Sequence, residues 1–141
     1  MSRSQEPRHT ADHNAAQGVV TRLSPWSVEE TIDRLAAVLA ARGIKLFTII
    51  DQSAEAEAVG LQLRDTRLVI FGSPNAGTPL MQAAPLAALD LPLKVVVWDD
   101  GNETQVSYTD PPELARRYHL EDDLAKRLAA VPTIVQAVID R

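Results

Sequence analysis

The stretch that decides the fold runs from Leu93 to Tyr108 and reads LKVVVWDDGNETQVSY. Two runs that are rich in β-branched and aromatic residues, 93–98 and 104–108, flank the polar segment Asp-Asp-Gly-Asn. Asp-Gly and Gly-Asn pairs tolerate the positive φ angles that tight turns require. The stretch therefore predicts a β-hairpin, to which the other strands are added.

Three more strands are predicted before the hairpin, at 19–23, 46–50 and 67–71. The third of them reads RLVIF, an apolar run without alternation. Alternation is typical of a sheet with one face in water, so a strand that lacks it is covered on both faces or lies centrally. We therefore place residues 67–71 in the middle of the sheet.

The clearest helix follows the first strand. Ser27 and Glu30 have the spacing of a capping box, apolar residues recur on one face at positions 28, 32, 35 and 39, and Gly43 supplies a left-handed stop. Further helices are predicted at 53–59, 78–84, 110–118 and 120–138. In the second of these, Thr78 is expected as the N-cap and Pro79 as the first helical residue. In the last, Pro132 predicts a kink or two helices.

The predicted order is β-α-β-α-β-α-β-β-α-α, in one domain that spans residues 18–141. Residues 1–17 are polar and aperiodic and predict a flexible tail. This tail lacks the apolar core of a secretory signal, and no later stretch approaches the roughly 18 unbroken apolar residues of a membrane span. A cytoplasmic protein without a membrane partner is expected.

Composition excludes several classes of function. The chain has 141 residues, with 14 Lys and Arg against 19 Asp and Glu, and a formal net charge of −5. Nucleic acids and anionic membranes favour clustered cations, so neither is an expected partner. The chain has no cysteine, which removes disulfides, thiolate metal sites and cysteine nucleophiles together. No cofactor and no metal are predicted.

Five segments follow one another in the order and spacing of a known family. They are Ala56–Arg64, Leu68–Pro74, Gly77–Met81, Leu89–Lys94 and Val106–Tyr108. The series resembles the domain of unknown function 302 family. The resemblance implies an α+β fold in which a curved, mostly antiparallel sheet carries helices packed on one side, similar to the TATA-binding-protein-like architecture. It also implies a homodimer, and it implies no known reaction.

One departure from the family pattern bears on chemistry. Gln52 stands where many members of the family have His, and an imidazole there could transfer protons near neutral pH. His119 is the single histidine of the predicted domain, so no Ser-His-Asp arrangement is supported. No catalytic residue is predicted.

The best candidate for a binding site is the segment from Gly72 to Thr78, which leaves a buried strand and enters a helix. The N–H groups of a helix start can hold a phosphate or a carboxylate, and Arg64 would add positive charge there. The predicted ligand-binding residues are Gly72, Ser73, Asn75, Gly77, Thr78 and Arg64. The alternatives are a plain turn with a capping threonine, and an ion pair between Arg64 and Asp65, Glu57 or Asp51.

The remaining polar and aromatic groups are expected to have no ligand-binding role. His9 and His13 have a metal-binding spacing but fall in the predicted tail, and the acidic residues of 99–103 lack the EF-hand spacing of a calcium loop. Trp98 and Tyr108 are expected in the core or in dimer contacts rather than stacked on nucleic-acid bases.

Three hypotheses about function follow from these residues. The first is a homodimeric, non-enzymatic protein that binds a small anionic ligand at Gly72–Thr78. The second is an enzyme that uses carboxylates, with Glu57 or Asp51 as its acid or base. The third is a structural or regulatory homodimer without a ligand, with an apolar interface on the hairpin or the C-terminal helices and no pocket at Gly72–Thr78.

Overall fold

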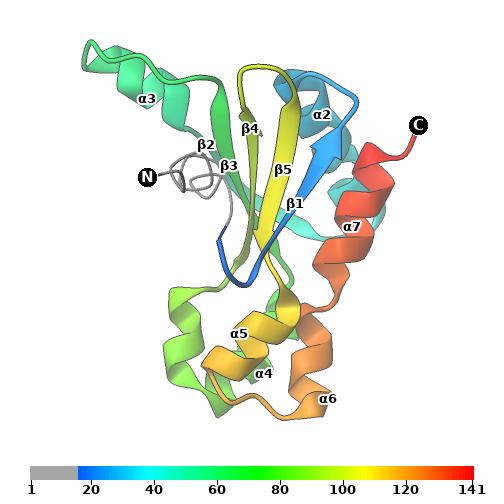
Figure 1. Cartoon of the computed structure of the whole chain (residues 1–141). Coiled ribbons are helices and arrows are strands. Elements are labelled where there is room, and N and C mark those ends of the chain that lie inside the picture. Colours follow the sequence, from blue (N-terminus) through cyan, green and yellow to red (C-terminus); the bar gives the residue numbers. More distant parts are fainter. Residues whose placement is uncertain (1–15) are drawn as a thin grey trace, which may run out of the picture.

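The computed structural model describes residues 16–141 and contains one five-stranded sheet in the order β1-β5-β4-β3-β2 (Figure 1). All four strand pairings are antiparallel. The strands are β1 (Val19–Ser24), β2 (Lys45–Asp51), β3 (Thr66–Gly72), β4 (Leu93–Asp99) and β5 (Thr104–Thr109). The predicted α+β class, the antiparallel sheet and the order of elements are confirmed.

The predicted hairpin is formed by β4 and β5, which pair from Val96 opposite Ser107 to Asp99 opposite Thr104. It occupies the centre of the sheet together with β3, but the central strand is β4. The apolar run in β3 lies second from the edge, between β4 and β2. β3 is therefore an interior strand, as predicted. The central strand is the equally apolar β4 and not β3.

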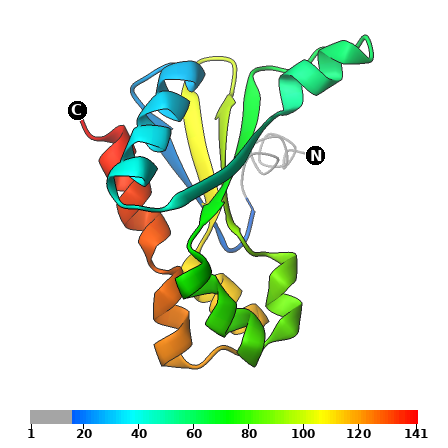
Figure 2. The same ribbon diagram turned by 180° about the vertical axis from the view of Figure 1, so that it is seen from behind.

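The helices divide between the sheet and its lower end. They are α2 (Val28–Ala41), α3 (Gln52–Ala58), α4 (Pro74–Ala83), α5 (Pro111–Arg117), α6 (Asp122–Ala125) and α7 (Ala130–Ile139). Two short 3-10 turns, η1 (Pro85–Leu89) and η2 (Lys126–Leu128), follow α4 and α6. Helices α2 and α7 lie side by side on one face of the sheet, and α3 projects away at the upper end (Figures 1 and 2).

The main core lies between the sheet and helices α2 and α7. The Ser27 hydroxyl accepts a hydrogen bond from the Glu30 N–H at 3.0 Å, so the predicted N-cap of α2 is confirmed. Leu35 and Leu39 of α2 and Ile134 of α7 are 2 % exposed or less. Burial of each such side chain stabilises the fold by about 1.5–3 kcal/mol. This layer fixes the sheet against the two helices.

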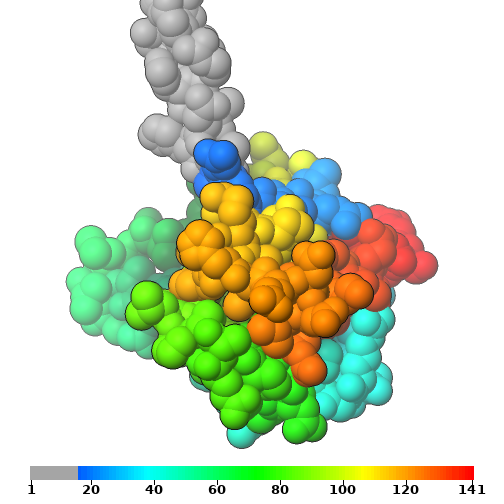
Figure 3. Space-filling view, turned by 90° about the horizontal axis from the view of Figure 1, so that it is seen from below, coloured from blue at the N-terminus to red at the C-terminus, as the bar shows by residue number. Residues whose placement is uncertain are grey.

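A second, smaller core holds the short helices together at the lower end of the sheet. Leu80 of α4, Leu114 of α5 and Leu128 of η2 are at most 6 % exposed and pack in one cluster. Figure 3 views this end of the molecule from below, where α4 is green and α5 and α6 are orange. The end of β3 therefore meets a helical cluster rather than open solvent.

Helix α4 begins five residues earlier than predicted. Its N-cap position is Ser73, whose backbone carbonyl accepts hydrogen bonds from the N–H groups of Ala76 and Gly77. Pro74 is the first helical residue, and Thr78 and Pro79 lie inside the helix. Proline favours the first helical position because it has no N–H to leave unsatisfied, and Pro74 takes the place that we predicted for Pro79.

The C-terminal segment breaks before Pro132 rather than at it. Helix α6 ends at Ala125, η2 ends at Leu128, and α7 begins at Ala130. Pro132 therefore lies in the first turn of α7, where its missing N–H costs no helical hydrogen bond. The prediction of two helices is correct, and proline is tolerated near the start of the second.

Two sequence predictions lie partly or wholly outside the described residues. The tail at 1–17 falls there except for its last two positions, as do His9 and His13. Within residues 16–141, none of the helices is long and apolar enough to cross a membrane.

Candidate functional site

The predicted segment Gly72–Thr78 lines a cavity of about 280 Å³, which we call the α4 cavity. It lies where the end of β3 and the start of α4 meet the segment Leu91–Leu93 and η2. Gly72, Ser73, Gly77 and Thr78 are among its lining residues. Its further walls are Phe47, Pro74, Ala76, Leu80, Met81, Leu91, Pro92, Leu93, Arg127 and Leu128.

One cation stands among these walls. Among the residues that the structure describes, Arg127 is the only charged one that lines the α4 cavity, in a chain whose net charge is −5. Its Nη1 donates a hydrogen bond to the backbone carbonyl of Asn75 at 3.2 Å. None of the ion pairs formed within residues 16–141 includes Arg127. The guanidinium group keeps its other donors available.

The bond from Arg127 to Asn75 has a local cause. Pro79 stands four residues after Asn75 inside α4, and a proline has no N–H to donate to the carbonyl four residues earlier. The Asn75 carbonyl therefore needs another donor, which Arg127 of η2 supplies. Asn75 contributes its backbone to the site and does not line the cavity.

A second cation lies beside the cavity. Lys45 pairs with Gly72 across β2 and β3, and its Nζ lies 4.8 Å from the centre of the Phe47 ring. Phe47 forms one wall of the α4 cavity and is 43 % exposed. Cations contact aromatic faces in this way because the ring quadrupole attracts them.

Arg64 does not join this site. It precedes β3, whereas Gly72 ends that strand, and seven extended residues span about 20 Å. Its guanidinium packs on the hairpin tip, where a Cβ added to Gly101 would lie 3.1 Å from Arg64 Cζ. Within residues 16–141 Arg64 forms none of the ion pairs considered as alternatives. The structure separates Arg64 from the Gly72–Thr78 segment.

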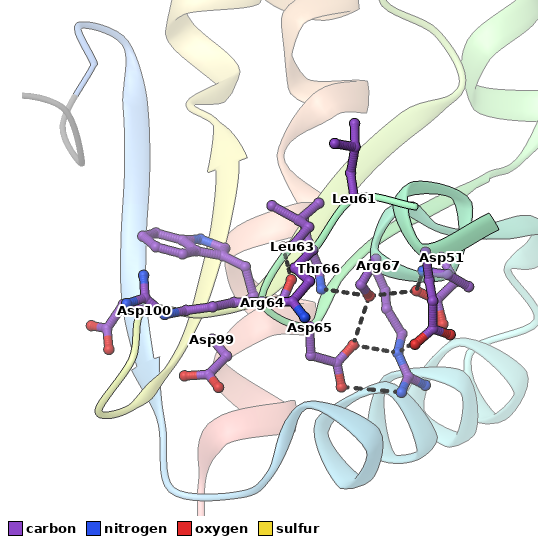
Figure 4. Close-up of a pocket in the computed structure, with 14 residues that line it drawn as sticks. Asp51, Leu61, Leu63, Arg64, Asp65, Thr66, Arg67, Asp99 and Asp100 are labelled. Carbon is purple, nitrogen blue, oxygen red and sulfur yellow. Dashed lines mark hydrogen bonds and ion pairs between the residues drawn. The ribbon is translucent and has the colours of Figure 1, made fainter. Parts of the chain in front are cut away.

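Arg64 instead lines a wide open groove of about 1040 Å³, which we call the acidic groove (Figure 4). The groove lies between α3, the connection to β3 and the tip of the β4–β5 hairpin. It is lined by two guanidinium groups, those of Arg64 and Arg67, against five carboxylates. The carboxylates are those of Asp51, Glu57, Asp65, Asp99 and Asp100.

The charges of the acidic groove are largely engaged with one another. Asp65 accepts two hydrogen bonds from Arg67, at 2.9 and 3.2 Å, in a planar fork. Asp51 caps α3 by accepting from the Ala54 N–H at 2.9 Å and also accepts from the Ser53 hydroxyl at 2.6 Å. The Ser53 hydroxyl, the Ala54 N–H and nearby Arg67 hold the pKa of Asp51 below its ordinary value.

A lowered pKa weighs against the enzyme hypothesis. Asp51 stays ionised near neutral pH, so it is a poor proton donor and a weak base. The position next to it, Gln52, begins α3, is exposed and carries no titratable group. Glu57 lines the same groove and is exposed. The lowered pKa of Asp51 therefore does not suit it to proton transfer at neutral pH.

The carboxylates at the hairpin tip accept hydrogen bonds from neighbouring groups of the hairpin itself. Asp100 accepts hydrogen bonds from the N–H groups of Asn102 and Glu103 and from the Gln105 side chain, and these bonds lower its pKa to about 2. Asp99 accepts from the Gly101 N–H at 2.8 Å. Among residues 16–141, no group of three or more His, Cys, Asp or Glu side chains is placed to hold a metal ion.

The comparison with known proteins gives the family. Residues 20–138 match the family described as Domain of unknown function DUF302. The chain belongs to the DUF302 family. A crystal structure of an uncharacterized conserved DUF302 protein from Bacillus stearothermophilus covers 89 % of this chain and 98 % of its own, with a TM-score of 0.75 and 20 % identity. At that identity, the likeness shows the fold alone.

Curated relatives of this DUF302 chain include proteins named as ion channels. The chain is 43 % identical over 104 residues to a protein named fluoride-specific ion channel FluC 1 of Brucella suis biovar 1 (strain 1330), and the match covers 73 % of the chain and 41 % of that protein. FluC 1 of Brucella abortus biovar 1 (strain 9-941) matches with the same identity over 38 % of its length. The chain thus spans about two fifths of the relatives it matches.

The two hairpin aromatics of this DUF302 chain lie on opposite faces of the sheet. Tyr108 is 6 % exposed and packs in the main core with α2 and α7. The indole N–H of Trp98 donates to the Ser107 hydroxyl at 3.0 Å. Trp98 follows the buried Val97 along β4, so its side chain points to the face opposite α2 and α7. Tyr108 is a core residue, as expected, whereas Trp98 lies on the opposite face of the sheet from the main core.

Proposed function

We propose that the protein is a non-enzymatic binding protein for a small anionic ligand and that the ligand occupies the α4 cavity. The observation that carries the proposal is Arg127, the only charged residue of the cavity lining, which makes no ion pair in the described part of the chain. It replaces Arg64 as the cation next to the Gly72–Thr78 segment. A cytoplasmic location remains the prediction made from the sequence.

The names of the relatives make fluoride one anion to test. We favour an organic anion over fluoride, because a small, strongly hydrated ion gains little from an apolar cavity of about 280 Å³. The match covers only part of each named channel, so channel activity itself is not part of the proposal.

Thermal unfolding in the presence of candidate anions tests the proposal. A ligand that binds the folded state raises Tm by mass action, with about 2.7 kcal/mol of stabilisation at a concentration of 100 times Kd. Fluoride, phosphate, nucleotides and organic acids form the panel. At least one organic acid is expected to raise Tm in the wild type and less in Arg127→Gln, with Arg116→Gln on α5 as the matched control. No rise with any anion contradicts the proposal.

The second candidate function is a homodimer, favoured by a specific surface. The edge strand β2 exposes Leu46, Phe47, Ile49 and Ile50, each between 36 and 43 %. An exposed apolar edge strand offers unpaired backbone groups and side chains to another chain. The adjoining face of the sheet, opposite α2 and α7, adds the half-buried Trp98. This surface differs from the hairpin and C-terminal helices expected from the sequence.

The mass of the protein in solution tests the dimer. Light scattering at micromolar concentration is expected to give twice the chain mass for the wild type and the chain mass for Ile50→Lys, because an edge lysine opposes strand pairing. Leu89→Lys is the matched control, since Leu89 is 75 % exposed on η1. A monomeric wild type contradicts this second candidate.

A further inference from the structure

We propose that the ligand of the α4 cavity is an amphipathic monocarboxylate, with an aliphatic or aromatic body inside the cavity and its carboxylate at Arg127. This inference rests on the proposed function and names the class of anion. It is argued from the walls, the volume and the charge of the cavity.

The walls suit an apolar body. Leu80 and Leu128 are 1 and 2 % exposed and continue from the second core into the cavity. Leu93 and Met81 are half-buried beside them. An unbranched methionine adapts its rotamers to irregular shapes. An alkyl or aryl body would bury Met81 and Leu93 further, whereas a wholly polar anion would leave these two side chains without apolar contacts.

The volume sets the size of the body. Ligand sites for drug-sized molecules run from roughly 300 to 1,000 Å³, so about 280 Å³ is at the small end. At about 30 Å³ for each water-sized group, the cavity holds about nine non-hydrogen atoms. A medium-chain fatty acid or a simple aromatic acid has this size, and a nucleotide is too large.

The charge favours a carboxylate over a phosphate. A guanidinium group matches a carboxylate in a planar, two-bonded fork. A single arginine balances one negative charge, and none of the acidic residues within 16–141 lines the cavity to repel it. A phosphate dianion would bring a second negative charge against apolar walls that hold no second cation among the described residues, which is costly. Lys45 lies outside the walls, against Phe47, and adds positive potential at this end.

The ordering of Arg127 also fits this role. Arg127 is exposed, and its hydrogen bond to the Asn75 carbonyl directs the guanidinium to the first turn of α4. A side chain that such a bond already restrains loses less conformational entropy when it binds a ligand. Arg127 acts as the binding cation. Pro79 acts indirectly, because it leaves the Asn75 carbonyl free to accept the hydrogen bond from Arg127.

Isothermal titration of the full chain with straight-chain carboxylates, from acetate to dodecanoate, tests the inference at neutral pH and constant ionic strength. Affinity is expected to rise by up to about fourfold for each added methylene, and to stop rising near octanoate, when the cavity is full. Octanol and phosphate are the probes that carry only the apolar body or only the charge. Both are expected to bind at least tenfold more weakly than octanoate.

The outcomes separate this inference from the proposed function. If acetate, phosphate and octanoate bind equally, the anion site stands and the amphipathic class is wrong. If octanol binds with the same affinity as octanoate, or if no anion binds, both the proposed function and the amphipathic class are wrong. Arg127→Lys is expected to retain part of the affinity and Arg127→Gln to lose at least tenfold, with Arg116→Gln unchanged. A full octanoate affinity in Arg127→Gln overturns the assignment of the carboxylate to Arg127.

Discussion

The two ends of β3 differ in how their charges are used. The acidic groove at the start of the strand carries five carboxylates and two guanidinium groups, and several of them already hold one another or cap turns. The α4 cavity at its end carries one arginine among apolar walls. We therefore expect the richer cluster of charges to bind an anion more weakly, because several of its groups are already engaged within the fold.

Truncation of one apolar side chain at each end is the strongest test of this contrast. Leu128→Ala removes a side chain that is 2 % exposed and is expected to lower the free energy of unfolding by about 3 kcal/mol. Leu61→Ala at the acidic groove removes one that is 65 % exposed and is expected to change it by less than about 0.5 kcal/mol. Urea denaturation measures both, and similar losses would erase the difference between a packed cavity and an open groove.

Replacement of one arginine at each end tests where a ligand binds. Arg127→Gln is expected to weaken octanoate binding about tenfold, or about 1.4 kcal/mol, because a charge-assisted hydrogen bond is lost. Arg64→Gln, which alters the guanidinium over Gly101, is expected to leave the affinity unchanged. Titration calorimetry on the two variants decides between the cation found in the structure and the one predicted from the sequence.

Replacement of a glycine by alanine is expected to change the free energy of unfolding with opposite sign near the two ends of β3. A Cβ at Gly77 meets no atom within 4 Å, and Gly77 lies inside α4, so Gly77→Ala should stabilise the protein by about 0.5–1 kcal/mol. Gly60 follows α3 with φ of +79°, and Gly60→Ala should destabilise it by about 1 kcal/mol. Thermal unfolding gives both signs, and a loss of stability in Gly77→Ala would show that α4 is not helical there.

The smallest expected effect is a dependence on pH that arises at the acidic groove. The pKa of Asp100 is lowered from 3.8 to about 2 by hydrogen bonds, first of all from the Glu103 N–H. A lowered pKa contributes stability that is present above 3.8 and is lost as the pH falls towards 2. Asp100→Asn should therefore show a shallower fall of Tm across this range. An identical pH profile in the variant would show that these bonds do not lower the pKa.

The order of elements could be predicted because it depends on local signals. The Ser27 cap, the Asp-Gly-Asn turn and the apolar periodicity of α2 act within a few residues of one another. The start of α4 was misplaced because two prolines, Pro74 and Pro79, both satisfy the rule for a first helical residue. The choice between them as the first residue of α4 depends on where β3 ends. β3 ends at Gly72 because it pairs with β2 up to that residue.

The composition of the site depends on longer-range contacts. Arg64 was grouped with Gly72 because both flank one strand, although the length of that strand already places them at opposite ends. Arg127 reaches Asn75 across 52 positions of the chain. Pro79 leaves the Asn75 carbonyl without a helical donor only because α4 begins at Pro74, and the packing of η2 against α4 decides which side chain supplies one.

The most direct test of the central claim uses the glycine amide resonances of an isotopically labelled sample during titration with octanoate. Gly72 and Gly77 line the α4 cavity, whereas Gly101 lies at the acidic groove beneath Arg64. We expect the resonances of Gly72 and Gly77 to shift with ligand concentration and that of Gly101 to stay in place. Shifts at Gly101 without shifts at Gly72 and Gly77 would contradict the assignment of the ligand to the α4 cavity.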